Sequence, residues 1–220
     1  MKIIDKEEVR IAEEQTPEGK KKKMLSKIGT IVFFVVLFIV FYFLDRNHVF
    51  SGEPYPIRVE NITVIPGETT VQEILQAGYD LSDRDHGEWM NDVGGFYYSE
   101  VIDPAVEADP NSYYNLILVK EGTAYASITI YNSEEWKSKS LPECRVSKIE
   151  VAAFHKGSDQ ATILDIPLTE VTKEAISDYL GAEPEVSETR CVWKKGKYSL
   201  TLNSDDSISG RTIISEYVLN

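Results

Sequence analysis

The chain has 220 residues, of which 42% are hydrophobic and 27% are charged, and its formal net charge at pH 7 is −13. This charge argues against nucleic acid as a partner, because the phosphate backbone is itself anionic. Only two cysteines occur, which excludes a disulfide-rich scaffold, and neither has a second cysteine or a histidine at the spacing of a zinc site.

An uncharged apolar run near the N-terminus predicts a membrane-spanning helix. From Ile28 to Leu44 the chain has no charged residue and consists mainly of Ile, Val, Phe and Leu. Counted from Met24, with Lys27 extending toward the interface, the helix would be about 31 Å long, which matches the hydrocarbon core of a bilayer. The segment that follows, DRNHVFSGE, lacks the small-residue cleavage site of a signal peptide. We therefore expect residues 28–45 to contact membrane lipid as an uncleaved signal anchor.

The charges on the two sides of this run predict its orientation. Five lysines precede the run, whereas one aspartate and one arginine follow it directly. Positive charge beside a membrane span stays in the cytoplasm, so we expect a single-pass protein of the plasma membrane with its N-terminus inside and its C-terminus outside. Residues 28–220 hold 15 of the 23 Lys and Arg and 30 of the 36 Asp and Glu, a net charge of −15. The part outside the membrane would therefore be strongly acidic.

Beyond the linker, the sequence repeats a pattern. IPGETTVQEILQAGYDLSD, which starts at residue 65, and IPLTEVTKEAISDYLGAEP, which starts at residue 166, each predict a short amphipathic helix. The two helices are expected at residues 69–77 and 170–180, each beginning near a threonine and ending at a glycine. Each is followed by two alternating strands joined at an x-Gly dipeptide, Glu121-Gly122 and Lys195-Gly196, which is the pattern of a β-hairpin.

A third strand follows each hairpin, at residues 145–154 and 212–219. The sequence therefore predicts an α+β fold: one N-terminal transmembrane helix, then an ectodomain of two helix-plus-antiparallel-meander units. A unit of about 60 residues buries too little surface to be stable alone, so the two units should share one core. The expected domains, in chain order, are the cytoplasmic tail 1–27, the transmembrane helix 28–45, a linker 46–57, unit 1 at 58–160 and unit 2 at 161–220.

Three phrases of the ectodomain resemble a group of bacterial extracytoplasmic proteins, mostly from Gram-positive bacteria. They are ETTVQEILQAGYDLSD, YNSEEWKSKSLPECRVSKIEV and IPLTEVTKEAISDYLGAEP. The members of this group are membrane-anchored or lipid-anchored, and most are of unknown function. The tandem helix-plus-meander layout looks like the fold of the beta-lactamase inhibitor protein. The resemblance covers residues 58–220 and implies fold and location, and it carries over no inhibitory residue because no matching motif is present.

Unit 1 contains an insert, residues 83–112, that unit 2 lacks. Loops of this length in compact domains are usually functional or disordered, and the aromatic content of this insert argues against disorder. Tyrosine and tryptophan suit binding surfaces, and they equally suit the packing of a long loop against a sheet. We expect Trp89, Tyr97 and Tyr98 to form part of a partner-binding surface, with core packing as the alternative.

Both cysteines, Cys144 and Cys191, lie in strand-like runs beyond the expected span, where a disulfide is chemically permitted. A bridge between the two units and a pair of buried free thiols are both compatible with the sequence. His48, His86 and His155 lie in loop-like contexts, so we expect all three side chains to be exposed.

An acidic stretch at residues 80–88 raises the question of calcium, because this ion prefers several carboxylate oxygens. Gly87 stands where the third ligand of an EF-hand loop would be, so a solvated acidic loop is the favoured interpretation. We predict no metal ligand at this or any other position.

Signatures of known enzyme classes are absent from the sequence, including G-x-S-x-G, the P-loop, the dinucleotide fingerprint and H-E-x-x-H. We therefore predict no catalytic residue and no cofactor. The expected function is that of a non-enzymatic, membrane-anchored extracytoplasmic binding protein with a protein partner at the cell surface. Two alternatives stay open: an envelope assembly or division component in which residues 56–81 begin a POTRA-like module, and an envelope enzyme with a site that no motif reveals.

Overall fold

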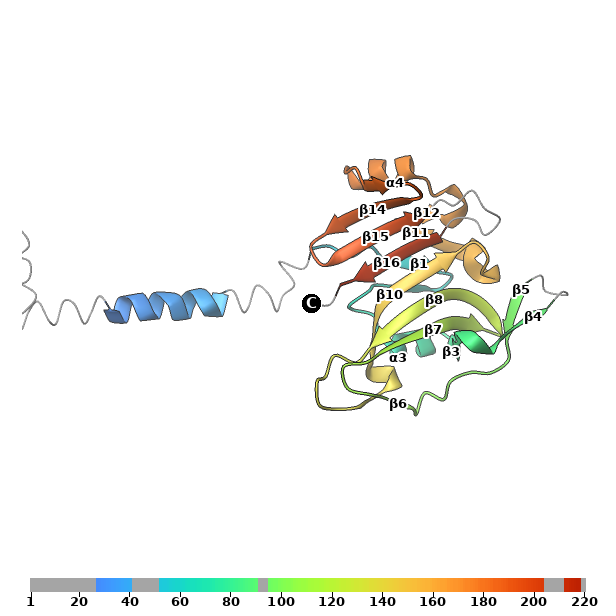
Figure 1. The fold of residues 1–220 in the computed structure, drawn as a ribbon, viewed down its shortest axis with the longest axis horizontal. Coiled ribbons are helices and arrows are strands. Elements are labelled where there is room, and N and C mark those ends of the chain that lie inside the picture. Colours follow the sequence, from blue (N-terminus) through green and yellow to red (C-terminus); the bar gives the residue numbers. More distant parts are fainter. Residues whose placement is uncertain (1–26, 41–51, 91–94, 204–211, 219–220) are drawn as a thin grey trace, which may run out of the picture. The chain divides into compact units, whose positions relative to one another are not determined.

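A computed structural model of the chain describes residues 27–40, 52–90, 95–203 and 212–218. The fold is mixed α+β, with mostly antiparallel sheets and few helices (Figure 1). The chain divides into two compact units, Met1–Phe50 and Ser51–Asn220.

In the first unit, residues 27–40 form an α-helix with exposed apolar side chains. Within the described part of the chain, no helix combines the length and the apolar character that crossing a membrane requires. The expected span continues to residue 45, and residues 41–45 lie outside the described ranges. The transmembrane helix therefore stays a prediction.

The second unit contains a small sheet with the strand order β12–β11–β1–β2. Its strands are β1 (Ile57–Val59), β2 (Ile62–Val64), β11 (Ala161–Ile163) and β12 (Ile166–Pro167). The central pair is β1 with β11, which run antiparallel and place Ile57 opposite Ile163. Because alternate side chains of a strand point to opposite faces, Ile57 and Val59 point to the same face, and both are buried.

In the part of the chain that the structure describes, the large sheet contains ten strands. They are β3 (Asp80–Asp83), β4 (Gly87–Met90), β5 (Gly95–Tyr98), β7 (Tyr113–Lys120), β8 (Thr123–Tyr131), β10 (Arg145–Ala152), β13 (Glu185–Ser187), β14 (Arg190–Lys195), β15 (Tyr198–Asn203) and β16 (Thr212–Tyr217). Across the sheet, the strands β3, β7, β8 and β10 lie on one side and β16, β15, β14 and β13 on the other, so that β10 and β16 meet in the middle. The pair β4–β5 attaches at the start of β8.

Two α-helices of this unit, α3 (Val71–Gln76) and α4 (Lys173–Leu180), begin at threonine caps. The side chain of Thr70 accepts a hydrogen bond from the Glu73 amide while the Glu73 carboxylate accepts one from the Thr70 amide, which is a capping box. The second helix begins at Thr172, three residues after the expected Thr169, because residues 168–170 form a separate 3₁₀ turn. Gly181 ends α4 in the left-handed conformation, which a glycine adopts without steric cost.

Shorter elements connect these parts. The 3₁₀ turns are η1 (Arg84–His86), η2 (Leu141–Glu143), η3 (Lys156–Gln160) and η4 (Leu168–Glu170), and β6 (Glu107–Ala108) pairs with β9 (Lys139–Ser140). Of the two expected hairpin turns, the one at Glu121-Gly122 is confirmed, since Lys120 pairs with Thr123. The other lies one residue later than expected, at residues 196–197, because Lys195 still pairs with Tyr198.

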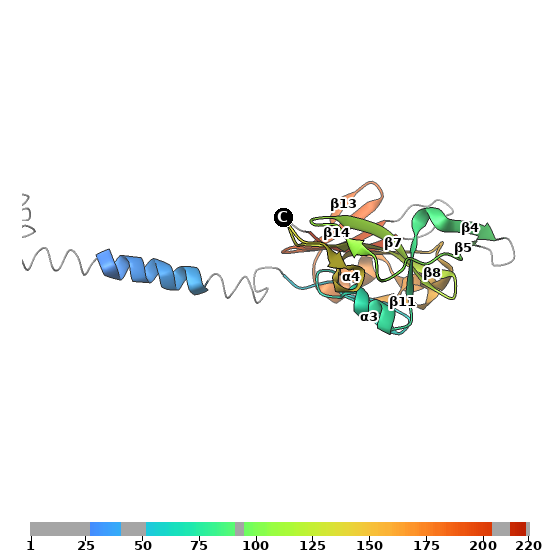
Figure 2. The same ribbon diagram turned by 90° about the horizontal axis from the view of Figure 1, so that it is seen from below.

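Both helices and the small sheet lie on one side of the large sheet (Figure 2). The buried cluster on this side takes side chains from both halves of the unit, for example Val71 and Ile149 from the first half and Ile176 and Leu200 from the second. In the described residues neither α3 nor α4 packs against the opposite face, which is called the uncovered face below (Figure 2).

Candidate functional site

The aromatic residues that the sequence predicted for a partner surface occupy different environments. Within the insert, β4 and β5 form a hairpin that projects from the rest of the unit (Figures 1 and 2). Trp89 is 61% exposed and packs edge to face against Phe96, which is itself 48% exposed. Tyr98 is only 6% exposed and belongs to a small buried cluster with Ile117, Val119 and Ala124. Trp89 and Tyr98 therefore correspond to the two alternatives, surface and packing.

Tyr97 is half-buried and lies over the turn that joins β7 to β8. A Cβ atom built on Gly122 would lie 2.1 Å from the Tyr97 ring, so only glycine leaves room for this ring. The backbone of Gly122 also has a φ of +75°, which other residues rarely adopt. Tyr97 is thus a packing residue that attaches the hairpin to the sheet.

The uncovered face of the large sheet presents polar side chains in rows. In one row, Asn115 lies opposite Thr129, which lies opposite Lys148. The next row begins at Ile117 and continues through Ser127 and Glu150 on the same strands. These positions alternate with the core positions, because successive side chains of a strand point to opposite faces.

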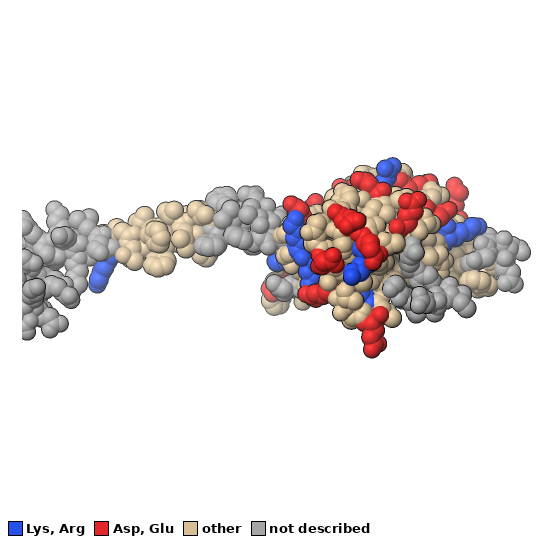
Figure 3. Space-filling view, turned by 90° about the horizontal axis from the view of Figure 1, so that it is seen from above, with Lys and Arg blue, Asp and Glu red and all other residues tan. Residues whose placement is uncertain are grey.

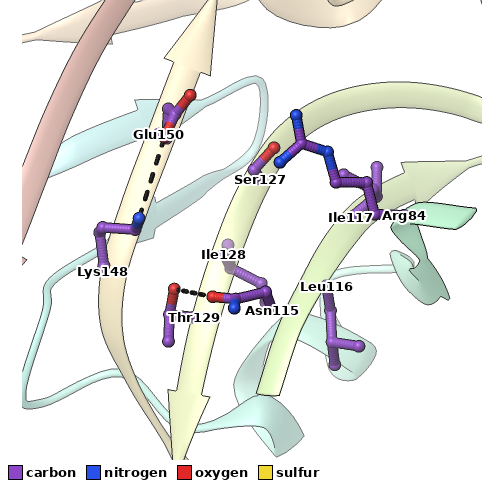
Figure 4. Close-up of a pocket in the computed structure, with 9 residues that line it drawn as sticks. All are labelled: Arg84, Asn115, Leu116, Ile117, Ser127, Ile128, Thr129, Lys148 and Glu150. Carbon is purple, nitrogen blue, oxygen red and sulfur yellow. Dashed lines mark hydrogen bonds and ion pairs between the residues drawn. The ribbon is translucent and has the colours of Figure 1, made fainter. Parts of the chain in front are cut away.

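A groove crosses this face as two adjoining hollows with cavity volumes of about 260 Å³ and 330 Å³. Figure 4 shows the residues that line the first hollow. Asn115, Thr129 and Lys148 line both hollows, so we treat them as one continuous groove. The first hollow also has Arg84, Ser127 and Glu150 in its lining. The groove therefore combines charged, amide and hydroxyl groups from three neighbouring strands and the insert.

Arg84 comes from the first turn of the insert. Asp83 caps this 3₁₀ turn by accepting a hydrogen bond from the amide of Asp85, which fixes the direction in which the Arg84 side chain leaves the backbone. In Figure 4 the guanidinium extends toward Ser127. Among the described residues, no carboxylate forms an ion pair with Arg84 and no acceptor forms a hydrogen bond with its side chain.

The other polar groups of the groove are partly satisfied. The Thr129 hydroxyl donates a hydrogen bond of 2.7 Å to Oδ1 of the Asn115 side chain. The two N–H groups of the same side-chain amide have no partner among the described residues. Lys148 lies 3.9 Å from Glu150, so these two charges offset each other. Ser127 makes no side-chain hydrogen bond to any described residue. At the Arg84 end of the groove, the polar groups that have no partner among the described residues are therefore mainly hydrogen-bond donors.

His155 is buried, which corrects the expectation that it would be exposed. It is 5% exposed, its ring lies 4.5 Å from that of Phe154, and its Nδ1 atom has no hydrogen-bond partner in the described part of the chain. In the sequence His155 directly follows the strand expected at residues 145–154, so its context was loop-like. The sequence did not reveal that η3 packs this segment against β8. Burial, with a smaller contribution from the nearby Arg84 charge, lowers the pKa of His155 to about 4.

The other histidines and the acidic stretch give no metal site in the described residues. His86 is exposed and lies 3.4 Å from the Glu100 carboxylate. His48 lies outside the described ranges. Within those ranges no group of three His, Cys, Asp or Glu side chains is placed to hold a metal ion, and residues 80–88 form β3, η1 and the start of β4.

Cys144 and Cys191 are both free thiols, so of the two alternatives the structure has the unbridged one. Cys144 is buried and directly precedes β10, whereas Cys191 is half-buried on β14. Two strands, β16 and β15, lie between β10 and β14. Strands are spaced about 4.8 Å apart, so the two residues are separated by at least about 14 Å, which a disulfide cannot span.

Comparisons of this chain with protein-family models, with curated proteins and with solved structures found no match. The assignment of a function therefore depends on the geometry of the groove and on the pattern of the sequence.

Sequence reasoning missed the groove, although a signal for it was present. In the segments YYNLILV and SITIY, the residues Asn115, Ser127 and Thr129 occupy the positions that alternate with buried ones. The alternation of buried and exposed positions predicted the strands. It could not show that these positions on β7 and β8 lie beside β10 and next to Arg84. That arrangement depends on pairing between segments far apart in the sequence.

The different environments of Tyr98 and Trp89 lead to a first prediction. Tyr98→Ala removes a buried aromatic ring and should lower the free energy of unfolding by about 3 kcal/mol. Trp89→Ala removes a mostly exposed ring and should change it by less than about 1 kcal/mol. Urea denaturation of the two variants measures both values, and equal losses would contradict the assignment of Trp89 to the surface.

The buried His155 leads to a second prediction, on pH. Because its pKa is lower in the folded protein than the usual 6.5, the unfolded chain binds a proton that the folded chain does not. Stability should be fully present above pH 6.5 and should decrease as the pH falls toward 4, by about 2 kcal/mol between pH 7 and pH 5. Urea denaturation at each pH measures this change.

The controls for this experiment are two glutamine variants. His155→Gln removes the titrating group and should flatten the dependence in this window, whereas the exposed His86→Gln should leave it unchanged. An unchanged slope in His155→Gln would show that other groups cause the loss.

Proposed function

We propose that this protein is a membrane-anchored, extracytoplasmic interaction protein that binds a protein partner on the uncovered face of its large sheet. The observation that carries the proposal is the groove on that face, which contains an arginine, an amide and a hydroxyl group without internal partners among the described residues. Polar groups in such a position lose little when a partner replaces water, and they supply directional hydrogen bonds.

The anchor is the uncharged run that starts at Ile28, with lipid contacts through residues 28–45. Residues 27–40 are helical and leave their apolar side chains exposed, a surface that lipid tails would cover. The five lysines before the run favour a cytoplasmic N-terminus, so residues 51–220 would lie outside the cell. The resemblance to anchored extracytoplasmic proteins of Gram-positive bacteria supports the same location.

We further propose that residues 58–160 and 161–220 are two units of one plan. In each, a hairpin of the small sheet leads to a helix, then to an outer strand of the large sheet, then to a three-stranded meander. The strand order supports this, because it reads β3, β7, β8, β10 from one side and β13, β14, β15, β16 from the other. The insert then is an addition to the first unit that contributes Arg84 to the groove.

A binding role fits the groove better than catalysis does. In the described residues its lining contains neither histidine nor cysteine, and the hydroxyls of Ser127 and Thr129 form no hydrogen bond to the neighbouring Glu150 or Lys148 that would activate them. On the face shown in Figure 3, the acidic side chains of the described residues are spread out rather than concentrated at one site. The negative charge of the domain therefore acts as a general solubilising charge that disfavours nucleic acid.

A site-specific photo-cross-link in intact cells tests this function. A photoreactive amino acid in place of Tyr113, which is exposed and lines the second hollow, should form an adduct with a partner protein, and protease added outside the cells should digest that adduct. The same amino acid at Tyr179, which is exposed on α4, is the matched control. Equal adducts from both positions, no adduct from Tyr113, or an adduct protected from the protease would each contradict the proposal.

A further inference from the structure

The groove has one closed end and one open end. At the closed end the insert covers the sheet, because Tyr98 packs over Ile117 and Val119 on β7. Arg84 belongs to the same insert and lines the hollow next to this covered region. The opposite end is lined by Tyr113 and Val218, which are both exposed. A chain that lies in the groove can continue past the open end but stops at Arg84.

The charges of the groove differ between its two ends. Arg84 is the cation at the closed end, and it forms no ion pair with any described residue. In the middle, Lys148 and Glu150 offset each other at 3.9 Å. Glu216 lines the hollow at the open end, where it is half-buried. The groove is therefore positive where it is closed and negative where it is open, which favours one direction of a polar chain.

The hydrogen-bonding groups near the closed end select for acceptors. The Arg84 guanidinium offers several N–H donors in one plane, and the Asn115 amide offers two more N–H groups. Ser127 adds a hydroxyl. A guanidinium forms paired hydrogen bonds with a carboxylate, and peptide carbonyls suit the amide and the hydroxyl. A phosphate monoester fits less well, because it brings nearly two charges to one unpaired cation in a domain that is strongly negative.

The length of the groove gives the size of the ligand. Along β7 the lining extends from Ile117 to Tyr113, which is four residues or about 14 Å of strand. An extended peptide of about four residues covers this distance.

We propose that the groove binds the C-terminal end of an extended peptide, with the terminal carboxylate on Arg84 and the preceding carbonyls on Asn115 and Ser127. This assignment rests on the proposed function, since it names the part of the partner that enters the groove. The closed end excludes residues beyond the carboxylate, and Glu216 at the open end accepts N–H donors from the residues that precede.

Retention of peptides by the immobilised full-length protein in detergent micelles tests this site. The probes are three pools of N-acetyl tetrapeptides: uncharged sequences with a free carboxylate, the same sequences as carboxamides, and carboxamides with glutamate as the last residue. Mass spectrometry measures the amount of each pool retained. The free-carboxylate pool should be retained at least tenfold more than either amide pool.

The variants assign this preference to one side chain. Arg84→Gln should reduce retention of the free-carboxylate pool to the level of the carboxamides, and Arg84→Lys should restore it only in part because an ammonium lacks the planar pair of donors. Arg58→Gln is the matched control, since Arg58 is an exposed arginine of the small sheet whose Nε bonds a backbone carbonyl. It should retain the peptides as the wild type does.

Four results would overturn the inference: no retention of any pool, equal retention of acid and amide, equal retention of the glutamate pool, or unchanged retention in Arg84→Gln. Equal retention of the glutamate pool would identify a side-chain carboxylate as the ligand instead of a chain end. The in-cell cross-link at Tyr113 separates this failure from that of the proposed function. If the adduct forms in Arg84→Gln as in the wild type, the interaction face stands and the carboxylate site is wrong.

Discussion

The antiparallel pairing of β10 with β16 is the contact on which the rest of residues 51–220 depends. It joins Lys148–Ala152 to Thr212–Glu216 in one continuous register. Because side chains alternate along a strand, the same pairing places Ile149 and Val151 in the core and Lys148 and Glu150 on the uncovered face. The pairing of β1 with β11 repeats this connection in the small sheet. Both sheets thus cross the boundary between the two halves, and neither half has a complete sheet or a complete core of its own.

Two further features follow from this arrangement. The groove is a product of the junction, since its lining takes side chains from β7, β8 and β10 on one side and from β16 on the other. The small sheet is fixed to the large one by a polar contact: Lys120 lies 2.8 Å from the Glu60 carboxylate, and the Tyr79 hydroxyl donates to the Val59 carbonyl at 3.1 Å. The Tyr79 hydroxyl also donates to Glu60, and burial followed by this hydrogen bond raises the pKa of Tyr79 above its usual value. These contacts hold the small sheet against the large one, on the side opposite the uncovered face.

Local patterns predicted much of this fold, and contacts between distant segments account for what was missed. The start of the first helix near a threonine was predictable because capping depends on residues three positions apart, and the structure has Thr70 as the cap. The hairpin at residues 120–123 was equally local, whereas the second turn moved by one residue because cross-strand pairing continues to Lys195. Burial of His155 and Tyr98 could not be predicted from local patterns. His155 is buried where η3 packs against β8, and Tyr98 is buried against β7 and β8, which follow the insert in the chain. Arg84 was not recognised as a site residue for the same reason: its neighbours in the groove come from β8 and β10.

Native-state hydrogen exchange can measure whether the two halves of residues 51–220 form one cooperative body. The amides of Ile128 and Ile130 on β8 report on the first half, and those of Leu200 and Leu202 on β15 report on the second. If the halves unfold together, all four amides should exchange with the same free energy of opening and the same dependence on denaturant. A lower free energy and a weaker denaturant dependence for Leu200 and Leu202 would show that the second half opens alone, and would contradict the account.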